Sequence, residues 1–268
     1  MTALDRTLHR PGAGIRFRDG GGDGRSVVFL HGAGMDHTMF LAAADAAQAA
    51  GFRAVLCDLR GHGESDLGAG VRFTADDALD DVLALLDALE LDRPVLVGHS
   101  LGGNLAQAFV RAHPQRTGGL IAVDSTWNAG PLSGIERFGL SLAAPMLALI
   151  PASRLPGIMA RASAVDPAAV AEITRVFARM PKKTFLDVWR ATVSFVDPDP
   201  EYRTPVPLGL IRGAEDRTGN IAKAMPAWAD AEGVHERVIP RAGHVVTLDA
   251  SDAASRAILE VLDGFALA

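Results

Sequence analysis

The chain has a single cysteine, Cys57, among its 268 residues. No intramolecular disulfide can form, so the fold must be held by a packed core and needs no oxidising compartment. Cys57 lies in the apolar run 53–57, where a buried thiol that packs within a strand is expected rather than a reactive nucleophile.

Lysine is also scarce, and charge of one sign is nowhere concentrated. The chain has only three lysines, and its net charge of -6 comes without a long acidic or basic run. A basic patch or stripe is the electrostatic signature of a nucleic-acid surface. The composition therefore predicts no nucleic-acid partner.

No stretch has the length and apolar character of a membrane span. The longest apolar region, residues 138–151, is interrupted by Pro145 and is shorter than the ~20 residues that a spanning helix needs. The first fourteen residues contain no apolar stretch of signal-peptide length, so a cytoplasmic location is expected.

Motifs for metal or cofactor binding are missing as well. The sequence has no HExxH, no paired cysteines and no glycine-rich phosphate loop that ends in Lys-Ser or Lys-Thr. The run GGGDG at 20–24 precedes a strand-like segment instead of following one, so it is interpreted as a hairpin turn. We therefore expect neither a cofactor nor a metal.

The patterns that are present alternate between strand and helix. Short apolar runs followed by turn residues occur at 26–30, 53–57, 94–99 and 119–124, and helical patterns lie between them. Such alternation predicts an α/β fold with a mostly parallel central β-sheet flanked by helices on both faces. Ligands in such sheets lie beyond the carboxyl ends of the strands.

The alternation is interrupted once. From Trp127 to about Tyr202 the sequence is helical and punctuated by proline, and the strand pattern then resumes. We predict a core domain formed by residues 1–126 and 203–268, with a helical cap, residues 127–202, inserted after the sixth strand.

The stretch GHSLGG at 98–103 raises the possibility of a serine nucleophile. Gly98-x-Ser100-x-Gly102 is a weak pattern alone, but here it stands between an apolar strand and a helix. Glycines on both sides of the serine permit a cramped turn that exposes its hydroxyl at a helix N-terminus. The alternative is an ordinary glycine-rich turn.

Several motifs in order resemble the α/β-hydrolase fold superfamily over nearly the whole chain. The resemblance implies that Ser100 is the nucleophile and that the backbone amides of Leu101 and Ala33 form the oxyanion hole. For His31 a supporting hydrogen-bonding role is preferred, and the turn after Cys57 is interpreted as structural, with Asp58 paired to Arg60. The motifs that carry the resemblance are HGAG (31–34), DLRGHGES (58–65), GHSLGG (98–103), GAED (213–216) and AGH (242–244).

A nucleophilic serine needs a base and an acid that holds the base. The superfamily orders these residues as serine, acid and histidine, which makes His244 the candidate base. Asp216, in a loop flanked by glycines and 28 residues before His244, is the favoured acid. Asp124, at the end of the strand that follows the nucleophile helix, stays open as the alternative.

These residues predict a serine hydrolase of the carboxylic ester hydrolase type, acting on esters or lactones of small, largely apolar molecules. Three alternatives stay open: a carbon–carbon bond hydrolase, a hydroxynitrile-lyase-type enzyme, and a small-molecule receptor with slow turnover. The sequence leaves the oligomeric state undetermined. The expected apolar substrate pocket consists of residues that could equally pack within the cap: Trp127, Phe138, Leu142, Met146 and Trp189.

Overall fold

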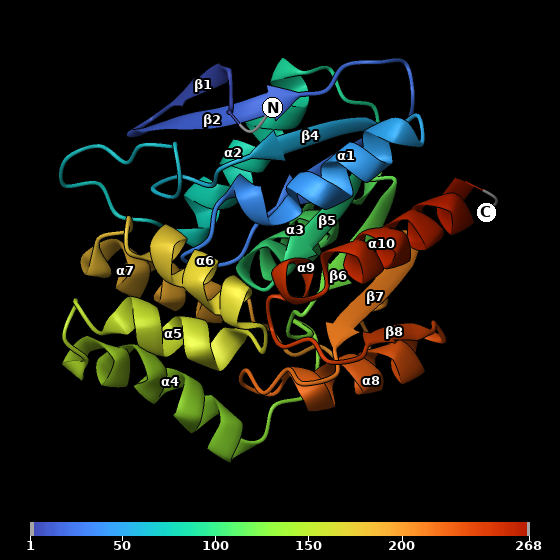
Figure 1. Ribbon diagram of the computed structural model, residues 1–268. Helices are drawn as coiled ribbons and strands as arrows, with labels where there is room; N and C mark the ends of the chain where they lie inside the picture. The colour runs from blue at the N-terminus through green and yellow to red at the C-terminus, as the bar shows by residue number, and fades with distance from the viewer. Residues whose placement is uncertain (1–2, 267–268) are drawn as a thin grey trace.

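A computed structural model describes residues 3–266 and contains one eight-stranded sheet (Figure 1). The spatial order is β1-β2-β4-β3-β5-β6-β7-β8. Strands β3 to β8 pair in parallel, whereas β1 and β2 are antiparallel to their neighbours. The strands are β1 Arg6–Arg10, β2 Ala13–Asp19, β3 Ser26–Leu30, β4 Arg53–Cys57, β5 Val95–His99, β6 Gly119–Val123, β7 Leu208–Gly213 and β8 Glu236–Ile239.

Helices cover both faces of this sheet. Successive residues of a strand point to opposite faces, so in β3 Val27 and Phe29 join one apolar cluster while Val28 and Leu30 join the other. This double burial explains why the parallel strands are continuous apolar runs. The fold class predicted from the sequence is confirmed. One face carries α1 (Leu41–Ala49) and α10 (Ser251–Ala266), and the other carries α2 (Ala75–Ala88), α3 (Leu101–Ala112) and α8 (Ile221–Glu232).

Two local predictions near the N-terminal half are wrong. Residues 20–24 do not form a hairpin turn, because β4 lies between β2 and β3 in the sheet. Arg60 does not pair with Asp58: its guanidinium binds Asp81 on α2 through two hydrogen bonds of 2.7 Å. Asp58 instead accepts hydrogen bonds from the backbone and ring of His37.

Four further helices lie between β6 and β7 and gather at one end of the sheet (Figure 1). A two-point ion pair joins them to the core, since Arg72 before α2 donates to both carboxylate oxygens of Asp187. No helix among residues 3–266 has the length and apolar character needed to cross a membrane. The four helices are α4 Gly134–Leu149, α5 Leu155–Ser163, α6 Pro167–Phe177 and α7 Lys182–Ser194.

The parallel strands deliver several loops to one edge of the sheet. The turn after β5, the segment after β6 and the loops after β7 and β8 all leave the carboxyl ends of adjacent or nearly adjacent strands. Residues separated by more than a hundred positions in the sequence can therefore meet at this edge.

Candidate active site

Ser100 occupies a strained backbone position between β5 and α3. Its φ of 50° and ψ of -115° lie in a region that residues with a side chain rarely adopt. Its amide donates to Val123 O on β6, and its carbonyl accepts from the amide of Asn104 on α3. The strained turn is thus fixed by the strand before it and the helix after it.

The glycines around Ser100 are required by close backbone contacts. A Cβ at Gly98 would lie 2.2 Å from Gly102 O, and a Cβ at Gly102 would lie 2.0 Å from Leu30 O. Both distances are far below van der Waals contact and involve backbone atoms that cannot rotate away. The motif is therefore a tightly packed strand–turn–helix junction rather than a loose glycine turn.

Three of the predicted residues come together here. His244, from the loop between β8 and α9 (Val246–Asp249), places Nε2 3.0 Å from the Oγ of Ser100. The Nδ1 of His244 lies 3.0 Å from Oδ2 of Asp216, which follows β7. Ser100 is partly exposed, whereas His244 and Asp216 are buried. The arrangement can relay a proton from the serine hydroxyl to the imidazole.

The surroundings of Asp216 favour its charged form. Burial opposes ionisation, but the hydrogen bond and charge of His244 and the amide of Thr218 outweigh it and hold the pKa of Asp216 below its usual value. As a carboxylate, Asp216 accepts the Nδ1–H of His244, which leaves Nε2 free to accept a proton from Ser100.

Asp124 is close to this group but lies in a different electrostatic environment. One carboxyl oxygen accepts from the amide of Gly213 at 2.8 Å, and the other is buried with no hydrogen-bond partner among the described residues. Burial, followed by the negative charge of Asp216, raises the pKa of Asp124 well above its usual value. The imidazole bonds to Asp216, while the surroundings of Asp124 favour its neutral form.

The same electrostatics bear on metal binding. Asp124, Asp216 and His244 offer ligand atoms that all lie within 4.8 Å of one another. A metal would need all three deprotonated, but the raised pKa of Asp124 favours its neutral form, and His244 Nδ1 is already bonded to Asp216.

The loop that carries Ala33 lies beside the serine. A Cβ at Gly32 would approach the Cβ of Ser100 to 3.4 Å, so the two turns are adjacent. Leu101 begins α3, and the first amides of a helix have no intrahelical acceptor. His31 supports the loop as expected, because its Nε2 accepts the amide of Leu59 and its Nδ1 bonds to Gly32 O. The oxyanion hole formed by Ala33 and Leu101 stays a prediction.

Sequence reasoning missed the contribution of His99. Its Nε2 lies 2.7 Å from the backbone oxygen of His244, and a carbonyl can only accept, so this nitrogen carries a hydrogen. Burial, and then the charge of His244, lower the pKa of His99 to about 3. His99 is therefore a neutral donor that holds the loop of the candidate base. Its place directly before the nucleophile was the only signal in the sequence.

Three of the five predicted pocket residues lie elsewhere. Phe138, Leu142 and Met146 on α4 are 65%, 42% and 60% exposed, so the expectation that they line a substrate pocket is wrong. The physical reason is that α4 is apolar around most of its circumference, and only the face that carries Ala144 and Leu147 turns toward the protein.

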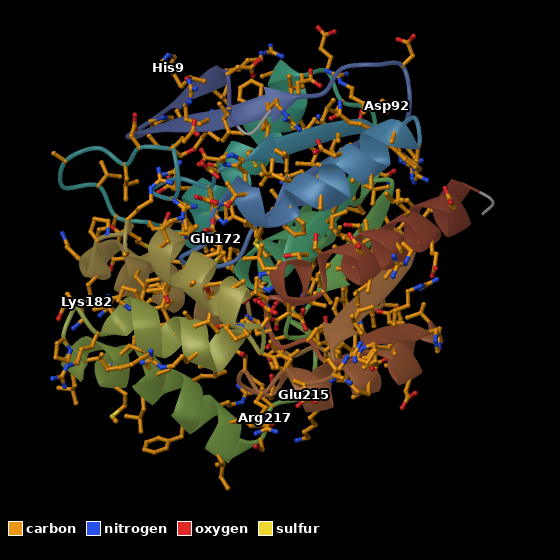
Figure 2. All side chains as sticks on the ribbon, in the orientation of Figure 1. His9, Asp92, Glu172, Lys182, Glu215 and Arg217 are labelled. Atoms are coloured by element: carbon orange, nitrogen blue, oxygen red, sulfur yellow. The ribbon has the colours of Figure 1, made fainter. Side chains whose placement is uncertain are left out.

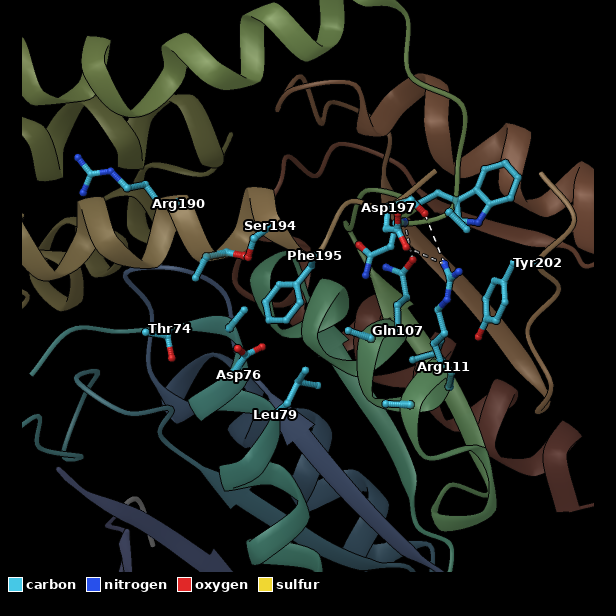
Figure 3. Close-up of a pocket in the computed structure, with 18 of the residues that line it drawn as sticks. Thr74, Asp76, Leu79, Gln107, Arg111, Arg190, Ser194, Phe195, Asp197 and Tyr202 are labelled. Carbon is cyan, nitrogen blue, oxygen red and sulfur yellow. Dashed lines mark hydrogen bonds and ion pairs between the residues drawn. The ribbon is translucent and has the colours of Figure 1, made fainter. Parts of the chain in front are cut away.

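The two tryptophans of that prediction are placed differently from each other. Trp127 is buried and stacks on Trp228, and it lines a cavity of about 710 Å³ beside α2, α3 and α7 (Figure 3). Ser100, His244 and Asp216 are not among the residues that line this cavity. Trp189 packs near Phe185 in the cluster that also contacts Ala33, and its buried Nε1 has no hydrogen-bond partner among the described residues.

A smaller cavity lies next to the loop of Ala33. It measures about 220 Å³ and is lined by Gly34 and Met35 of that loop, by Met180 from the turn between α6 and α7, and by Thr184 of α7. This volume is below the ~300–1,000 Å³ typical of pockets for drug-sized ligands. A cavity of this size suits a small molecule, but Ser100, His244 and Asp216 are not among the residues that line it.

Comparison with known proteins identifies a family model that matches most of the chain. A model of the "Alpha/beta hydrolase family" matches residues 27–257. The chain is 36% identical over 137 residues to a 2-hydroxy-6-oxononadienedioate/2-hydroxy-6-oxononatrienedioate hydrolase of Cupriavidus pinatubonensis, a match that covers 49% of this chain and 43% of that protein. The matches to this and the other most similar curated relatives span less than half of each relative's length.

Solved structures resemble the chain over nearly its full length. A thermophilic esterase from Thermogutta terrifontis has a TM-score of 0.76 and 27% identity, covering 97% of both chains. An enol-lactonase from Burkholderia xenovorans LB400 has a TM-score of 0.76 at 20% identity, covering 96% of this chain and all of the other. The second likeness concerns the fold alone.

Proposed function

The chain belongs to the alpha/beta hydrolase family, and on that premise we propose that it is a serine hydrolase that cleaves carboxylic esters or lactones of small molecules. The hydrogen-bonded series Ser100 Oγ, His244 and Asp216, with both contacts at 3.0 Å, is the observation that carries the proposal. Likeness to an esterase at 27% identity supports the ester-directed reading.

The reaction proceeds in two acyl-transfer steps. His244 Nε2 takes the proton of Ser100 as Oγ attacks the substrate carbonyl, and the amides of Leu101 and Ala33 stabilise the oxyanion. His244 then protonates the leaving oxygen, and an acyl-enzyme forms. Water, deprotonated by the same imidazole, attacks the acyl carbon, and the imidazolium then returns its proton to Ser100 Oγ as the acid leaves. The carboxylate of Asp216 stabilises the imidazolium in both steps.

A series of p-nitrophenyl esters from acetate to long acyl chains tests the proposal. We expect steady turnover by the native chain, and the acyl length at which turnover is fastest gauges the size of the substrate pocket. Ser100→Ala should be inactive while it retains native circular dichroism. Equal rates for the native chain and Ser100→Ala would contradict the proposal.

Carbon–carbon bond hydrolysis is the second candidate. It is favoured by the 36% identity to the oxononadienedioate hydrolase over 137 residues. A vinylogous 1,5-diketone with a distal carboxylate, followed by its visible absorbance, distinguishes the two. Turnover of the diketone without turnover of any ester would replace the first proposal by the second.

A hydroxynitrile-lyase-type reaction would instead release cyanide from a cyanohydrin. A receptor would bind a small molecule and gain thermal stability without forming product. Both would lose support if esters are turned over steadily.

A further inference from the structure

The reaction proposed above does not use the cavity of about 710 Å³ beside α2, α3 and α7. Its volume lies within the ~300–1,000 Å³ typical of sites for small molecules and cofactors. Along α3 its lining residues begin at Gln107 and end at Ala112. An α-helix rises ~1.5 Å per residue, which places them about 10–18 Å from Ser100 along the helix axis. The cavity therefore lies apart from the candidate nucleophile.

The interior of this cavity is apolar and aromatic. Trp127 and Trp228 are buried, and their rings stack within 3° of parallel. Phe195 and Leu120 are buried lining residues as well. Figure 3 shows Phe195 and Leu79 in the middle of the cavity. Such a lining favours a ligand with an apolar, ring-bearing body.

The two ends of the cavity differ in charge. Figure 3 shows Arg190 at one end and Arg111 at the other. Arg111 lies 2.9 Å from a carboxylate oxygen of Asp199 and 3.5 Å from one of Asp197, and its guanidinium stacks over the ring of Tyr202. Carboxylates therefore compensate the charge of Arg111 at its end of the cavity.

Cations gather at the opposite end. Arg72 and Arg190 pair with the same carboxylate of Asp187, at 2.7 and 2.9 Å, so two guanidinium groups share one negative charge. These three residues also line a neighbouring surface hollow of about 480 Å³, so the hollow adjoins the cavity. The cationic end, as we name it, comprises Arg72, Arg190 and two further residues that line the hollow, Lys182 and Lys183.

Carboxylates do not compensate the charge of the cationic end. Among residues 3–266 no carboxylate pairs with Lys182 or Lys183, and Lys182 donates instead to two backbone oxygens at the end of α4. Asp187 is the one acidic residue that lines the hollow. Asp76 lines the cavity next to Leu79, and even with it the four cations face only two carboxylates. An excess of positive charge beside an apolar cavity favours an anionic group on the ligand.

We propose that this cavity binds a small amphipathic carboxylate, with its apolar, ring-bearing body inside and its anionic group at the cationic end. The guanidinium groups of Arg72 and Arg190 are 60% and 52% exposed, so their remaining N–H groups can donate to a carboxylate. Lys183 supplies a third cation. The body of the ligand packs on Phe195 and extends toward Trp127.

The cationic end is also remote from the candidate acid. Figure 2 shows Lys182 at one end of the group formed by α4–α7, and Glu215 and Arg217, which flank Asp216, near the other end. A carboxylate bound at the cationic end therefore does not take the place of an acyl group on Ser100. The proposed binding site is independent of the reaction at the serine.

Three ligands with one body test the role of the anionic group: phenylbutyrate, phenylbutanol and phenylbutylamine. Emission of Trp127 and Trp228 reports binding, because both line the cavity and Trp189→Phe removes the chain's third tryptophan. We expect phenylbutyrate to bind about tenfold more tightly than phenylbutanol, and phenylbutylamine to bind most weakly. The advantage of the carboxylate should shrink as salt is added, because exposed charges are screened.

Substitutions at the two parts of the site test its location. Lys183→Gln should weaken phenylbutyrate about two- to fivefold and leave phenylbutanol unchanged, since it removes one exposed cation. Lys223→Gln is the matched control, because it removes the same charge from a lysine outside the cavity that pairs with Glu136. Ala108→Phe places a ring inside the cavity and should weaken both ligands. Thermal unfolding without ligand checks that each variant is folded.

Several results would overturn the proposal. Equal affinity for the three ligands, or tightest binding of the amine, would show that the cavity does not select an anion. Equal weakening by Lys183→Gln and Lys223→Gln would attribute the effect to overall charge. Phenylbutyrate binding that neither Lys183→Gln nor Ala108→Phe changes would place the ligand elsewhere on the protein.

Discussion

Two aspartates of the same chemistry lie in opposite electrostatic environments in this protein, since the pKa of Asp216 is lowered and that of Asp124 is raised. Asp216 accepts a ring hydrogen from His244 and an amide from Thr218, whereas Asp124 accepts from Gly213 and has an unpaired buried oxygen. Two carboxyls so close together in a dry site cannot both ionise easily, so hydrogen bonding decides which one holds the charge.

This division predicts unequal effects of the same substitution. Asp216→Asn should lower kcat by roughly 10³–10⁴-fold, because an amide neither fixes the tautomer nor stabilises the imidazolium. Asp124→Asn replaces a carboxyl whose neutral form is favoured by a neutral amide and should keep kcat within about tenfold of the native value. Ester kinetics at saturating substrate measure both. The reverse order of effects would make Asp124 the acid.

Stability against pH provides a test of Asp124 that needs no substrate. The pKa of Asp124 is higher in the folded chain than in the unfolded chain. Its contribution to the free energy of unfolding is therefore fully present below the unfolded pKa of 3.8 and is lost as the pH rises through the folded pKa. Relative to Asp124→Asn, the native chain should lose unfolding free energy as pH rises, measured by urea titration at several pH values. A difference that does not vary with pH would show that the carboxyl is ionised throughout.

His99 should act through the backbone of His244. In His99→Phe the buried carbonyl of His244 loses its hydrogen-bond donor, which should lower the free energy of unfolding by about 1–3 kcal/mol. Because the loop of His244 is then held less firmly, kcat should fall more than KM changes. His99→Gln restores a donor and should recover most of both losses. Urea titration and ester kinetics give the two quantities.

The pKa of His99 adds a pH dependence to this comparison. In the folded chain the pKa of His99 is lowered from 6.5 to about 3. The stability that the neutral imidazole contributes is therefore present above pH 6.5 and is lost as the pH falls below that value. The native chain should therefore weaken in acid relative to His99→Gln. Parallel pH curves for the two proteins would contradict this role.

At the scale of elements, the junction of β5 and α3 depends on backbone contacts. Gly102→Ala would force a Cβ to within 2.0 Å of Leu30 O, so it should destabilise the fold by about 1–3 kcal/mol and displace Ser100. Gly264→Ala, in α10 with no atom near the added methyl, should instead stabilise by about 0.4–1 kcal/mol. Thermal unfolding of both variants measures the contrast, and equal shifts would contradict the packing argument.

The sequence predicted most elements of the sheet but not their neighbours. Apolar runs such as 26–30 and 95–99 identified buried strands because both faces are covered. The run 20–24 was misread because strand order is a long-range property, and β4 enters between β2 and β3 from a later part of the chain. For α4, periodicity could not decide which apolar side faces the protein.

The site was predictable where motif order sufficed. Ser100, His244 and Asp216 follow the order of the superfamily, and the sheet brings them into contact across 144 and 28 positions. The raised pKa of Asp124 and the donor role of His99 depend on burial and on distances between loops, which no local pattern encodes.

For the whole molecule, we predict that access to Ser100 depends on how the helices after β6 are held against the core. The ion pair between Arg72 and Asp187 joins α7 to the segment before α2, and α7 also contributes Thr184 to the small cavity near Ala33. Arg72→Gln should loosen this attachment, so long acyl esters should gain severalfold in kcat/KM relative to acetate.

Arg190 supplies a matched control within the same network. It pairs with the same Asp187 carboxylate at 2.9 Å, but both residues belong to α7, so this bond does not connect the helix to the core. Arg190→Gln removes an equal charge and should leave the preference for acyl length unchanged. If both variants shift the preference for acyl length equally, the effect comes from the charge of Asp187 rather than from the ion pair that attaches α7 to the core. That result would contradict the prediction that the helices after β6 limit access to Ser100.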